Sequence, residues 1–242
     1  MPNFPGSESK SHLADLRRRW VQGDHVVITG PTGGGKTALA RYVAEQRANR
    51  RGGTHMVFVM KFKPDATIKK EYTGYTRWSK WKKNPTTFDK RVLLWPEVEK
   101  YPSIKDKLKL QRDVFAEACD RLSDSEGWTV QNDEGFYFTH PQYLNLAGPW
   151  AVLQAMGRSA NTTLMTLAQR PAHLPLLVYT SASHVYVGRS REATDVKRLS
   201  EIGGGLGSKA LGEIISSQLA KHDFLYIPVV DDDKPRIVNL AK

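Results

Sequence analysis

The chain reads Gly30-Pro31-Thr32-Gly33-Gly34-Gly35-Lys36-Thr37 between an apolar run and a helical pattern. This octapeptide matches G-x-x-x-x-G-K-[ST], a loop whose backbone N–H groups and following helix end surround phosphate oxygens. Residues 25–29 before it predict a buried strand, and residues 37–46 after it predict an amphipathic helix. A strand, this loop and a helix in that order favour a nucleoside triphosphate site over a glycine-rich turn without a ligand.

Two side chains of the loop have distinct roles in such a site. Lys36 can reach the β- and γ-phosphates, and Thr37 can offer its hydroxyl to Mg²⁺. The glycines let the backbone turn its N–H groups inward. We therefore expect ATP and Mg²⁺ as cofactors, with all eight residues of the loop contacting the nucleotide.

The composition is that of a folded protein. Of 242 residues, 40% are hydrophobic and 10% are aromatic, which suffices for one substantial core. The single cysteine, Cys119, excludes a disulfide framework, fits a reducing compartment and falls inside a helical pattern as a small buried hydrophobe. No apolar run reaches the ~18 residues of a membrane span, and the N-terminus has no hydrophobic signal region. We expect a cytoplasmic protein (host cytoplasm if the chain is viral) without membrane insertion.

The positive charge is concentrated in one segment. The formal net charge is +11, and residues 61–112 hold 15 Lys/Arg against 6 Asp/Glu. The same stretch carries the aromatic residues Tyr72, Tyr75, Trp78, Trp81 and Phe88. Cations mixed with aromatics suit a nucleic-acid backbone, through charge neutralisation and stacking, and bind it without reading its sequence. The alternative is a solvated basic surface on an ordinary enzyme.

Hydrophobic periodicity predicts strands that alternate with helices. Strands are expected at residues 25–29, 55–61, 91–95, 128–134, 163–170 and 184–187, helices at 13–22, 37–46, 103–123, 146–159, 192–202 and 208–219, and a closing hairpin at 224–227 and 236–240. Residues 62–84 form the least regular stretch. The pattern predicts an α/β fold, with a mostly parallel sheet and helices on both faces. We expect an N-terminal arm with a short basic helix at 1–22 and one ATPase domain at 23–242.

Hydrolysis of a triphosphate needs acids beside the phosphate loop. A strand that ends in Asp-Glu is the usual source, and Asp133-Glu134 is the best such pair. Asp133 would hold Mg²⁺ through a water molecule, and Glu134 would orient or deprotonate the attacking water. The strand before the pair holds Gln131 and Asn132 where apolar residues are usual. A competing strand end, residues 229–231, lies in an acidic run that a solvated turn explains better.

The next predicted strand ends in Gln169-Arg170-Pro171. A polar side chain at the tip of a strand beside the loop's own strand would lie close to the γ-phosphate. The amide of Gln169 could then sense whether that phosphate is present. The alternative is an ordinary strand end that faces solvent.

Two further motifs make the pattern similar to a known family. Gly157-Arg158-Ser159 precedes a predicted strand, and that strand ends in Leu167-Ala168-Gln169-Arg170-Pro171. Together with the P-loop and the Asp-Glu strand end, they resemble the FtsK–HerA superfamily of DNA-pumping P-loop ATPases, with Ala168 in place of the family's threonine. Residues 184–199 also look like the family's next element. The resemblance covers about residues 23–230, implies a RecA-like core, and leaves residues 61–109 unmatched.

The resemblance implies a motor that forms a homo-oligomeric ring of six subunits and moves double-stranded DNA in genome packaging or DNA transfer. It makes Gln169 the sensor that couples hydrolysis to movement. It makes Arg158 the first candidate for the arginine that reaches a neighbouring subunit's nucleotide, with Arg189 and Arg191 as rivals and surface solvation as the alternative for all three. A portal or nuclease protein is an expected partner.

Two other functions stay open. Similar loops occur in small-molecule (nucleotide) kinases, which need a lid with clustered arginines, whereas residues 61–112 are mostly lysine among their cations. A non-motor ATPase for the assembly of filamentous phage or pili is the other alternative. Such proteins often carry a membrane span, and this sequence shows none.

Overall fold

The structure, a computed structural model, describes His12, Leu16 and residues 21–51, 53–63, 66–82, 90–202, 206–229 and 234–239. Within these residues the strands are β1 (His25–Thr29), β2 (Thr54–Phe58), β3 (Thr76–Trp78), β4 (Arg91–Leu94), β5 (Trp128–Asn132), β6 (Thr163–Ala168), β7 (Ala182–Val187), β8 (Asp223–Pro228) and β9 (Arg236–Asn239). They form one sheet in the order β3-β4-β2-β5-β6-β1-β7-β8-β9. Neighbours are parallel as far as β7, and the pairs β7–β8 and β8–β9 are antiparallel. The predicted α/β fold with a mostly parallel sheet is confirmed.

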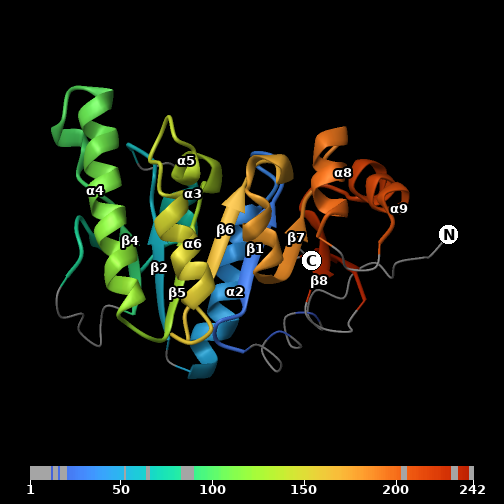
Figure 1. Cartoon of the computed structure of the whole chain (residues 1–242), viewed down its shortest axis with the longest axis horizontal. Coiled ribbons are helices and arrows are strands. Elements are labelled where there is room, and N and C mark those ends of the chain that lie inside the picture. The colour runs from blue at the N-terminus through green and yellow to red at the C-terminus, as the bar shows by residue number, and fades with distance from the viewer. Residues whose placement is uncertain are drawn as a thin grey trace.

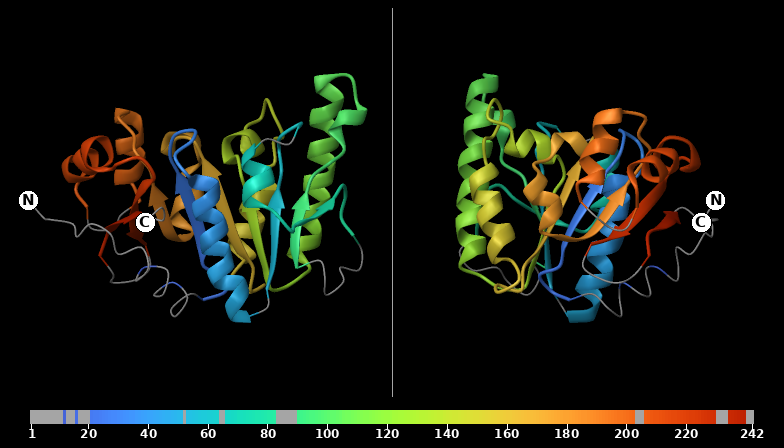
Figure 2. Two further views of the ribbon diagram at one scale, coloured as in Figure 1. Left: turned by 180° about the vertical axis from the view of Figure 1, so that it is seen from behind. Right: turned by 45° about the vertical axis from the view of Figure 1, so that its right-hand side comes forward.

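Helices cover both faces of this sheet. The α-helices of the described residues are α2 (Lys36–Arg51), α3 (Ala66–Glu71), α4 (Ile104–Ser123), α5 (Gly135–Thr139), α6 (Ala147–Met156), α7 (Leu176–Thr180), α8 (Ala193–Ser200) and α9 (Ser208–Glu213). A π-helix, Ile214–Gln218, continues α9, and 3-10 turns occupy Val98–Lys100 and Pro171–His173. Helices α4 and α6 lie on one face and α2 on the other (Figures 1 and 2). Among these helices none is long and apolar enough to cross a membrane.

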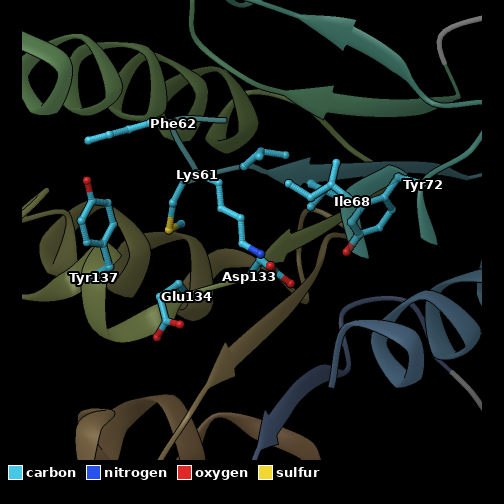
Figure 3. A pocket seen from close by; sticks show the side chains of 10 residues that line it. Lys61, Phe62, Ile68, Tyr72, Asp133, Glu134 and Tyr137 are labelled. Atoms are coloured by element: carbon cyan, nitrogen blue, oxygen red, sulfur yellow. The ribbon is translucent and has the colours of Figure 1, made fainter. Parts of the chain in front are cut away.

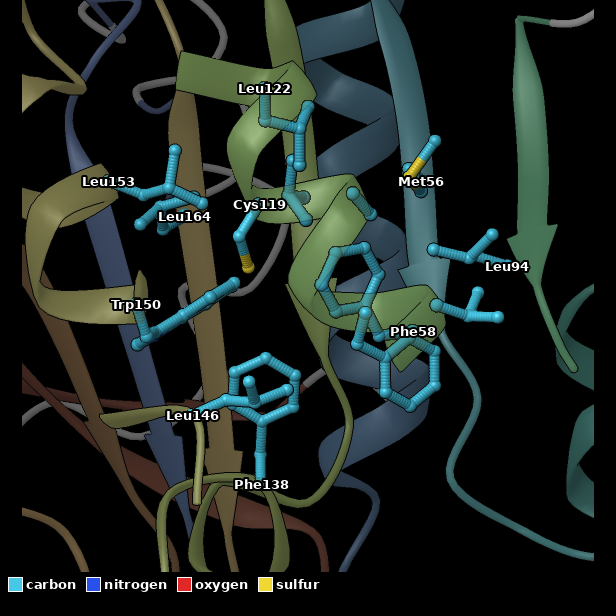
Figure 4. Packing of buried hydrophobic residues seen from close by; sticks show 14 of the residues in the cluster. Met56, Phe58, Leu94, Cys119, Leu122, Phe138, Leu146, Trp150, Leu153 and Leu164 are labelled. Atoms are coloured by element: carbon cyan, nitrogen blue, oxygen red, sulfur yellow. The ribbon is translucent and has the colours of Figure 1, made fainter. Parts of the chain in front are cut away.

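The strands are buried on both sides because the two faces have separate apolar cores. In β1, Val26 and Ile28 pack with α2, whereas Val27 packs in the cluster that includes residues of α7, α8 and α9. Farther along the sheet, Phe58 of β2 stacks on Phe115 of α4 with ring centroids 5.1 Å apart. Figure 4 shows this core between the sheet and helices α4 and α6. Continuous apolar runs, rather than alternation, are therefore the signature of these strands.

Several elements differ from the prediction. The stretch 62–84 is more regular than expected, since it contains α3 and β3, and β3 pairs with β4 near the sheet edge. Helices α5 and α7 were not predicted, because five residues are too few to display a 3.6-residue period. The expected helix 208–219 changes to a π-helix at Ile214. Most of the arm 1–22 and the acidic run 230–233 lie outside the described residues.

The topology brings four strand ends to one edge of the sheet. Strands β5, β6, β1 and β7 are neighbours and parallel, so their carboxyl ends lie together (Figure 1). The segments that leave these ends are the predicted phosphate loop after β1, Asp133-Glu134 after β5 and Gln169 after β6. Open parallel sheets bind ligands at this edge.

Candidate nucleotide-binding site

The phosphate loop, residues 30–35, connects β1 to α2. Two of its glycines adopt a left-handed backbone, with φ of +73° at Gly33 and +94° at Gly35. A Cβ atom on Gly34 would lie 2.9 Å from Pro31 O, the carbonyl to which Gly34 N donates a hydrogen bond at 3.0 Å. No atom of the described residues lies within 4 Å of the place that a Cβ would take on Gly33. The turn therefore closes tightly on one side and stays open on the other.

The two neighbouring strands hold the loop. Gly30 N donates to Ala168 O at the end of β6 at 3.2 Å, and Gly188 N, just beyond β7, donates to Thr29 O at 2.6 Å. A Cβ on Gly30 would lie only 3.1 Å from the Cα of Gly188. This close backbone approach ties the loop to the ends of both strands.

Lys36 turns back over the loop. Its Nζ donates to Gly30 O at 2.8 Å and to Pro31 O at 3.1 Å. Burial lowers the pKa of Lys36, and the negative charges of Glu134 and Asp133 oppose that effect. The ammonium is therefore held inside the loop and within the field of the two predicted acids.

Asp133 contacts Thr37, the residue that follows Lys36. Thr37 Oγ1 donates to Asp133 Oδ1 at 3.2 Å, and Gln131 Nε2 donates to the same oxygen at 3.2 Å. Gln131 also donates to the hydroxyl of Tyr72. The two polar residues that broke the expected apolar pattern of β5, Gln131 and Asn132, are both 0% exposed. The buried amide of Gln131 thus orients Asp133, the acid that follows its own strand.

Glu134 lies beside the predicted sensor. Gln169 Nε2 donates to Glu134 Oε2 at 3.3 Å, and Asn132 Oδ1 accepts a hydrogen bond from Glu134 N at 3.3 Å. The structure therefore brings the predicted base and the predicted sensor together. The competing acid, Asp231, lies outside the described residues.

Burial raises the pKa of both acids. For Asp133, the positive charge of Lys61 and the hydrogen bond from Thr37 oppose the rise in pKa. For Glu134, the hydrogen bond from Gln169 and the positive charge of Lys36 oppose it. A raised pKa makes a carboxylate a stronger base, which suits a group that takes a proton from water.

The residues present fit a nucleoside triphosphate with Mg²⁺. The loop offers an open concave side and a lysine, which is what phosphate oxygens require. Mg²⁺ binds one or two protein oxygens together with waters and phosphates, and the oxygens of Thr37 and Asp133 lie 3.2 Å apart. In addition, the buried hydroxyl of Thr29, just before the loop, has no hydrogen-bond partner in the described part of the chain.

A cavity of about 400 Å³ lies beside the two acids. Its wall is mainly apolar and aromatic, with Val57, Val59, Met60, Phe62, Ile68, Tyr72 and Tyr137. Lys61 lines it as well and points its ammonium toward Asp133 (Figure 3). The main chain of Lys61 is fixed, since Trp95 Nε1 donates to its carbonyl at 2.9 Å. Sequence analysis missed Lys61, although a residue just beyond a buried parallel strand is where a site residue is expected.

Arg158 lies away from the loop of its own chain. It is exposed and follows α6, and its Cα would lie 2.7 Å from a Cβ placed on Gly23. Gly23 precedes β1, so Arg158 lies at the amino end of the strand whose carboxyl end carries the phosphate loop. The structure therefore does not bring Arg158 together with the other predicted site residues of this chain.

The rival arginines, Arg189 and Arg191, are exposed on the loop after β7, at the same edge as the phosphate loop. Asp195 of α8 fastens this loop to the end of β6, and it is 1% exposed. Its carboxylate accepts three hydrogen bonds, from Ser190 Oγ (2.6 Å), Ala172 N (3.1 Å) and Arg170 Nε (3.4 Å). The segment next to Gln169 and the segment with the two arginines are thus joined through one buried carboxylate.

The aromatic residues of the basic segment belong mostly to the core. Trp78 is 1% exposed and Tyr72 is 4% exposed, and Tyr75 and Trp81 are half-buried against the same clusters. Phe88 lies outside the described residues. The expectation that these rings stack on nucleic acid is therefore wrong for Tyr72 and Trp78, because both side chains are buried in apolar clusters of the core.

Comparison with known proteins adds to this picture. No family model and no curated protein matches the chain. Solved structures do match. The genome packaging NTPase B204 from Sulfolobus turreted icosahedral virus 2, in complex with AMP, is 16% identical with a TM-score of 0.57, covering 89% of this chain and 96% of that chain.

Two other solved structures extend the comparison. VirB4 of Thermoanaerobacter pseudethanolicus is 8% identical with a TM-score of 0.62, covering 89% of this chain and 88% of that chain. The pCW3 conjugation coupling protein TcpA, in its monomer form with ATPγS, is 15% identical with a TM-score of 0.54, covering 93% of this chain and 61% of that chain.

At these identities the likeness concerns the fold. The chain has the fold of P-loop NTPases with a RecA-like core. The fold that the resemblance to the FtsK–HerA superfamily implied, a P-loop NTPase with a RecA-like core, is confirmed.

Proposed function

We propose that this chain is an ATPase that moves DNA, and that it works as a ring of identical subunits, with six as the expected number. The observation that carries the proposal is the meeting of Glu134 and Gln169 beside the phosphate loop. An ATP-hydrolysing motor needs a base for water and a group that reports the state of the γ-phosphate, and these two side chains are 3.3 Å apart.

Each residue of the site has a defined task in hydrolysis. The backbone of residues 30–37 and the ammonium of Lys36 hold the phosphates. Thr37 and, through a water molecule, Asp133 would hold Mg²⁺, which would supply positive charge to the phosphate oxygens. Glu134 accepts the proton of the attacking water, and its raised pKa strengthens it as a base.

Gln169 connects this chemistry to the rest of the molecule. Its amide donates to Glu134 and can turn to a phosphate oxygen instead, because it is exposed at the end of β6. A change at Gln169 reaches Arg170 directly, and Arg170 is bound to Asp195 on α8. This route leads from the phosphate to the loop of Arg189 and Arg191.

Contact with DNA is assigned to exposed cations rather than to aromatic rings. Lys63 follows β2, and Lys105 lies in the first turn of α4, which begins beyond β4. Both are exposed. Such contacts neutralise phosphates without reading the sequence, which a motor that grips any stretch of polymer requires.

The structural neighbours support a role in genome packaging or DNA transfer. B204 is described as a genome packaging NTPase and TcpA as a conjugation coupling protein. Transfer of these roles to this chain, with double-stranded DNA as the track and a portal or nuclease protein as a partner, is part of the proposal. An exposed Arg158 at the far end of β1 suits contact with the nucleotide of an adjacent subunit.

An ATPase assay with and without duplex DNA tests the function. We expect turnover that DNA stimulates and that added salt reduces steeply, since each phosphate contact releases counterions. Glu134→Gln should lower turnover at least ~100-fold while ATP still binds. The matched control is Glu126→Gln, which should leave turnover unchanged, because Glu126 is exposed and stands before β5, at the opposite end of the strand from Glu134.

Three outcomes would contradict the proposal. DNA-independent turnover together with no retention on DNA at low salt would exclude a motor. Phosphoryl transfer to a nucleoside monophosphate would identify a kinase, although the cavity beside the acids has a mainly apolar wall and Lys61 as its cation. Binding to a coat or secretion protein without DNA would favour an assembly ATPase.

A further inference from the structure

A short turn from a distant part of the chain packs against the phosphate loop. Residues 220–222 lead into Asp223, the first residue of β8, and a Cβ placed on Gly35 would lie 3.2 Å from His222 Nδ1. Phe224, the second residue of β8, approaches the same glycine, at 3.9 Å from that Cβ position. The imidazole of His222 therefore stands directly beside the backbone of the loop, although 187 positions, the difference between 222 and 35, separate the two residues.

The turn holds His222 in an unusual conformation. Its φ is +71°, in the left-handed region that side chains other than glycine and asparagine rarely adopt. Asp223 fixes the turn, since its side chain accepts a hydrogen bond from Ala220 N at 2.9 Å and its N–H donates to Ala220 O at 3.1 Å. Asn239 of β9 donates to the same carboxylate. The ring is thus placed by a rigid turn, and it is half-buried, so part of it stays accessible.

The order of the strands decides which end of a nucleotide lies near this ring. Asp133 and Glu134 follow β5, which is separated from β1 by β6 on one side of the phosphate loop. The terminal phosphate must point toward these acids if Glu134 is to activate the attacking water. The nucleoside then leaves the loop on the opposite side, where β7 and β8 lie. His222 stands at the start of β8, on that side.

We propose that His222 contacts the nucleoside of the bound triphosphate and stacks its imidazole on the base. This inference rests on the proposed binding of ATP and adds a residue for its recognition. Stacking between an aromatic side chain and a base is favourable for any base, because each base has a π-face. The site would therefore favour nucleoside triphosphates over an inorganic polyphosphate without selecting strongly among the bases.

Calorimetric titration of ATP and of inorganic tripolyphosphate into the protein tests the assignment. The variant is His222→Asn, because asparagine tolerates the left-handed backbone and leaves the turn intact. We expect ATP to bind about tenfold more weakly to H222N, at the lower end of the range for loss of one stacked base, and tripolyphosphate to bind as it does to the unchanged protein. His222→Gly, which accepts the same φ, provides a second variant with the same expectation.

The control is the adjacent Lys221→Asn, since Lys221 is exposed and carries a charge instead of a ring. Lys221→Asn should weaken the binding of both ATP and tripolyphosphate, or of neither. Unchanged ATP affinity in both His222 variants, or an equal loss for ATP and tripolyphosphate, would overturn the stacking role. If the unchanged protein bound tripolyphosphate but not ATP, the proposed function would fail together with this assignment.

Discussion

Replacing Asp195 with alanine tests whether the two segments beside the candidate nucleotide site, which hold Ala172 and Ser190, depend on one buried carboxylate. Asp195 lies in the first turn of α8, is 1% exposed and accepts hydrogen bonds from Ser190, Ala172 and Arg170. Alanine leaves three donors without this acceptor: the hydroxyl of Ser190, the backbone N–H of Ala172 and the Nε of Arg170. The effect on the free energy of unfolding can be worked out donor by donor.

The hydroxyl of Ser190 and the N–H of Ala172 belong to half-buried residues, so each loss costs about 1 kcal/mol, the lower end of the range for an unsatisfied donor. The side chain of Arg170 is 36% exposed and regains water, so it adds little. Loss of a negative charge at the start of α8 adds about 0.5 kcal/mol. The sum is about 2.5 kcal/mol, which corresponds to a fall in Tm of roughly 5–10 °C for a chain of this size.

Thermal and urea unfolding of Asp195→Ala measure this loss. The free energy of unfolding of Asp195→Asn should lie between those of the unchanged protein and Asp195→Ala, because the amide oxygen still accepts hydrogen bonds. Asp113→Ala is the matched control, since Asp113 is 58% exposed and pairs with an exposed lysine, and it should change the free energy of unfolding by less than about 0.5 kcal/mol. At 25 °C, where the variants are folded, we expect slower ATP turnover with little change in nucleotide binding, because Gln169 adjoins Arg170. A shift for Asp195→Ala no larger than that of Asp113→Ala would refute the reasoning.

Three other predictions concern the rest of the fold. Gly157→Ala should lower the free energy of unfolding by about 2 kcal/mol, because its Cβ would strike the His25 ring and lie 2.7 Å from Thr162 O. In Gly148→Ala the new Cβ would meet no atom of the described part of the chain within 4 Å, so this variant should not be destabilised, and chemical denaturation compares the two. Burial lowers the pKa of His25 below 6.5, so the unfolded state binds a proton at a higher pH than the folded state does. The free energy of unfolding should therefore fall as the pH decreases below 6.5. A His25→Gln variant whose free energy of unfolding fell with pH as steeply as that of the unchanged protein would contradict this. Burial raises the pKa of the Cys119 thiol, so a thiol reagent should label it only at the rate of unfolding, and rapid labelling of the native protein would be inconsistent with its 2% exposure.

The centre of the fold could be predicted because its signals are local. The phosphate loop is a contiguous motif, and β1 and α2 adjoin it with clear apolar patterns. The helix predicted at 103–123 is α4, Ile104–Ser123, because Ser103 caps it by accepting from Asp106 N at 3.1 Å and its apolar face repeats over five turns. In such segments the nearest neighbours in sequence determine the structure.

Side chains that act across the sheet could not be predicted in this way. Gln131 looked like a defect of its strand, because the sequence does not show that Tyr72 and Asp133 lie within hydrogen-bond reach. Lys61 and Asp195 gave no motif, since their partners come from other strands and helices. Similarly, the aromatic residues near Lys61 could be assigned to the core only once β3 was known to extend the sheet.

The position of Arg158 determines how subunits would have to meet if it acts on a neighbour's nucleotide. Strand β1 spans about 13 Å between its ends, with Gly23 and Arg158 near its start and the phosphate loop after its end. One chain cannot place both at the same nucleotide. The edge with the loop must therefore face the opposite edge of the next subunit, which makes the contact head-to-tail rather than two-fold. A head-to-tail contact closes into a ring only when its rotation divides a full turn, and otherwise it continues as a filament. The proposed ring thus requires a particular rotation between adjacent subunits as well as an arginine at their interface.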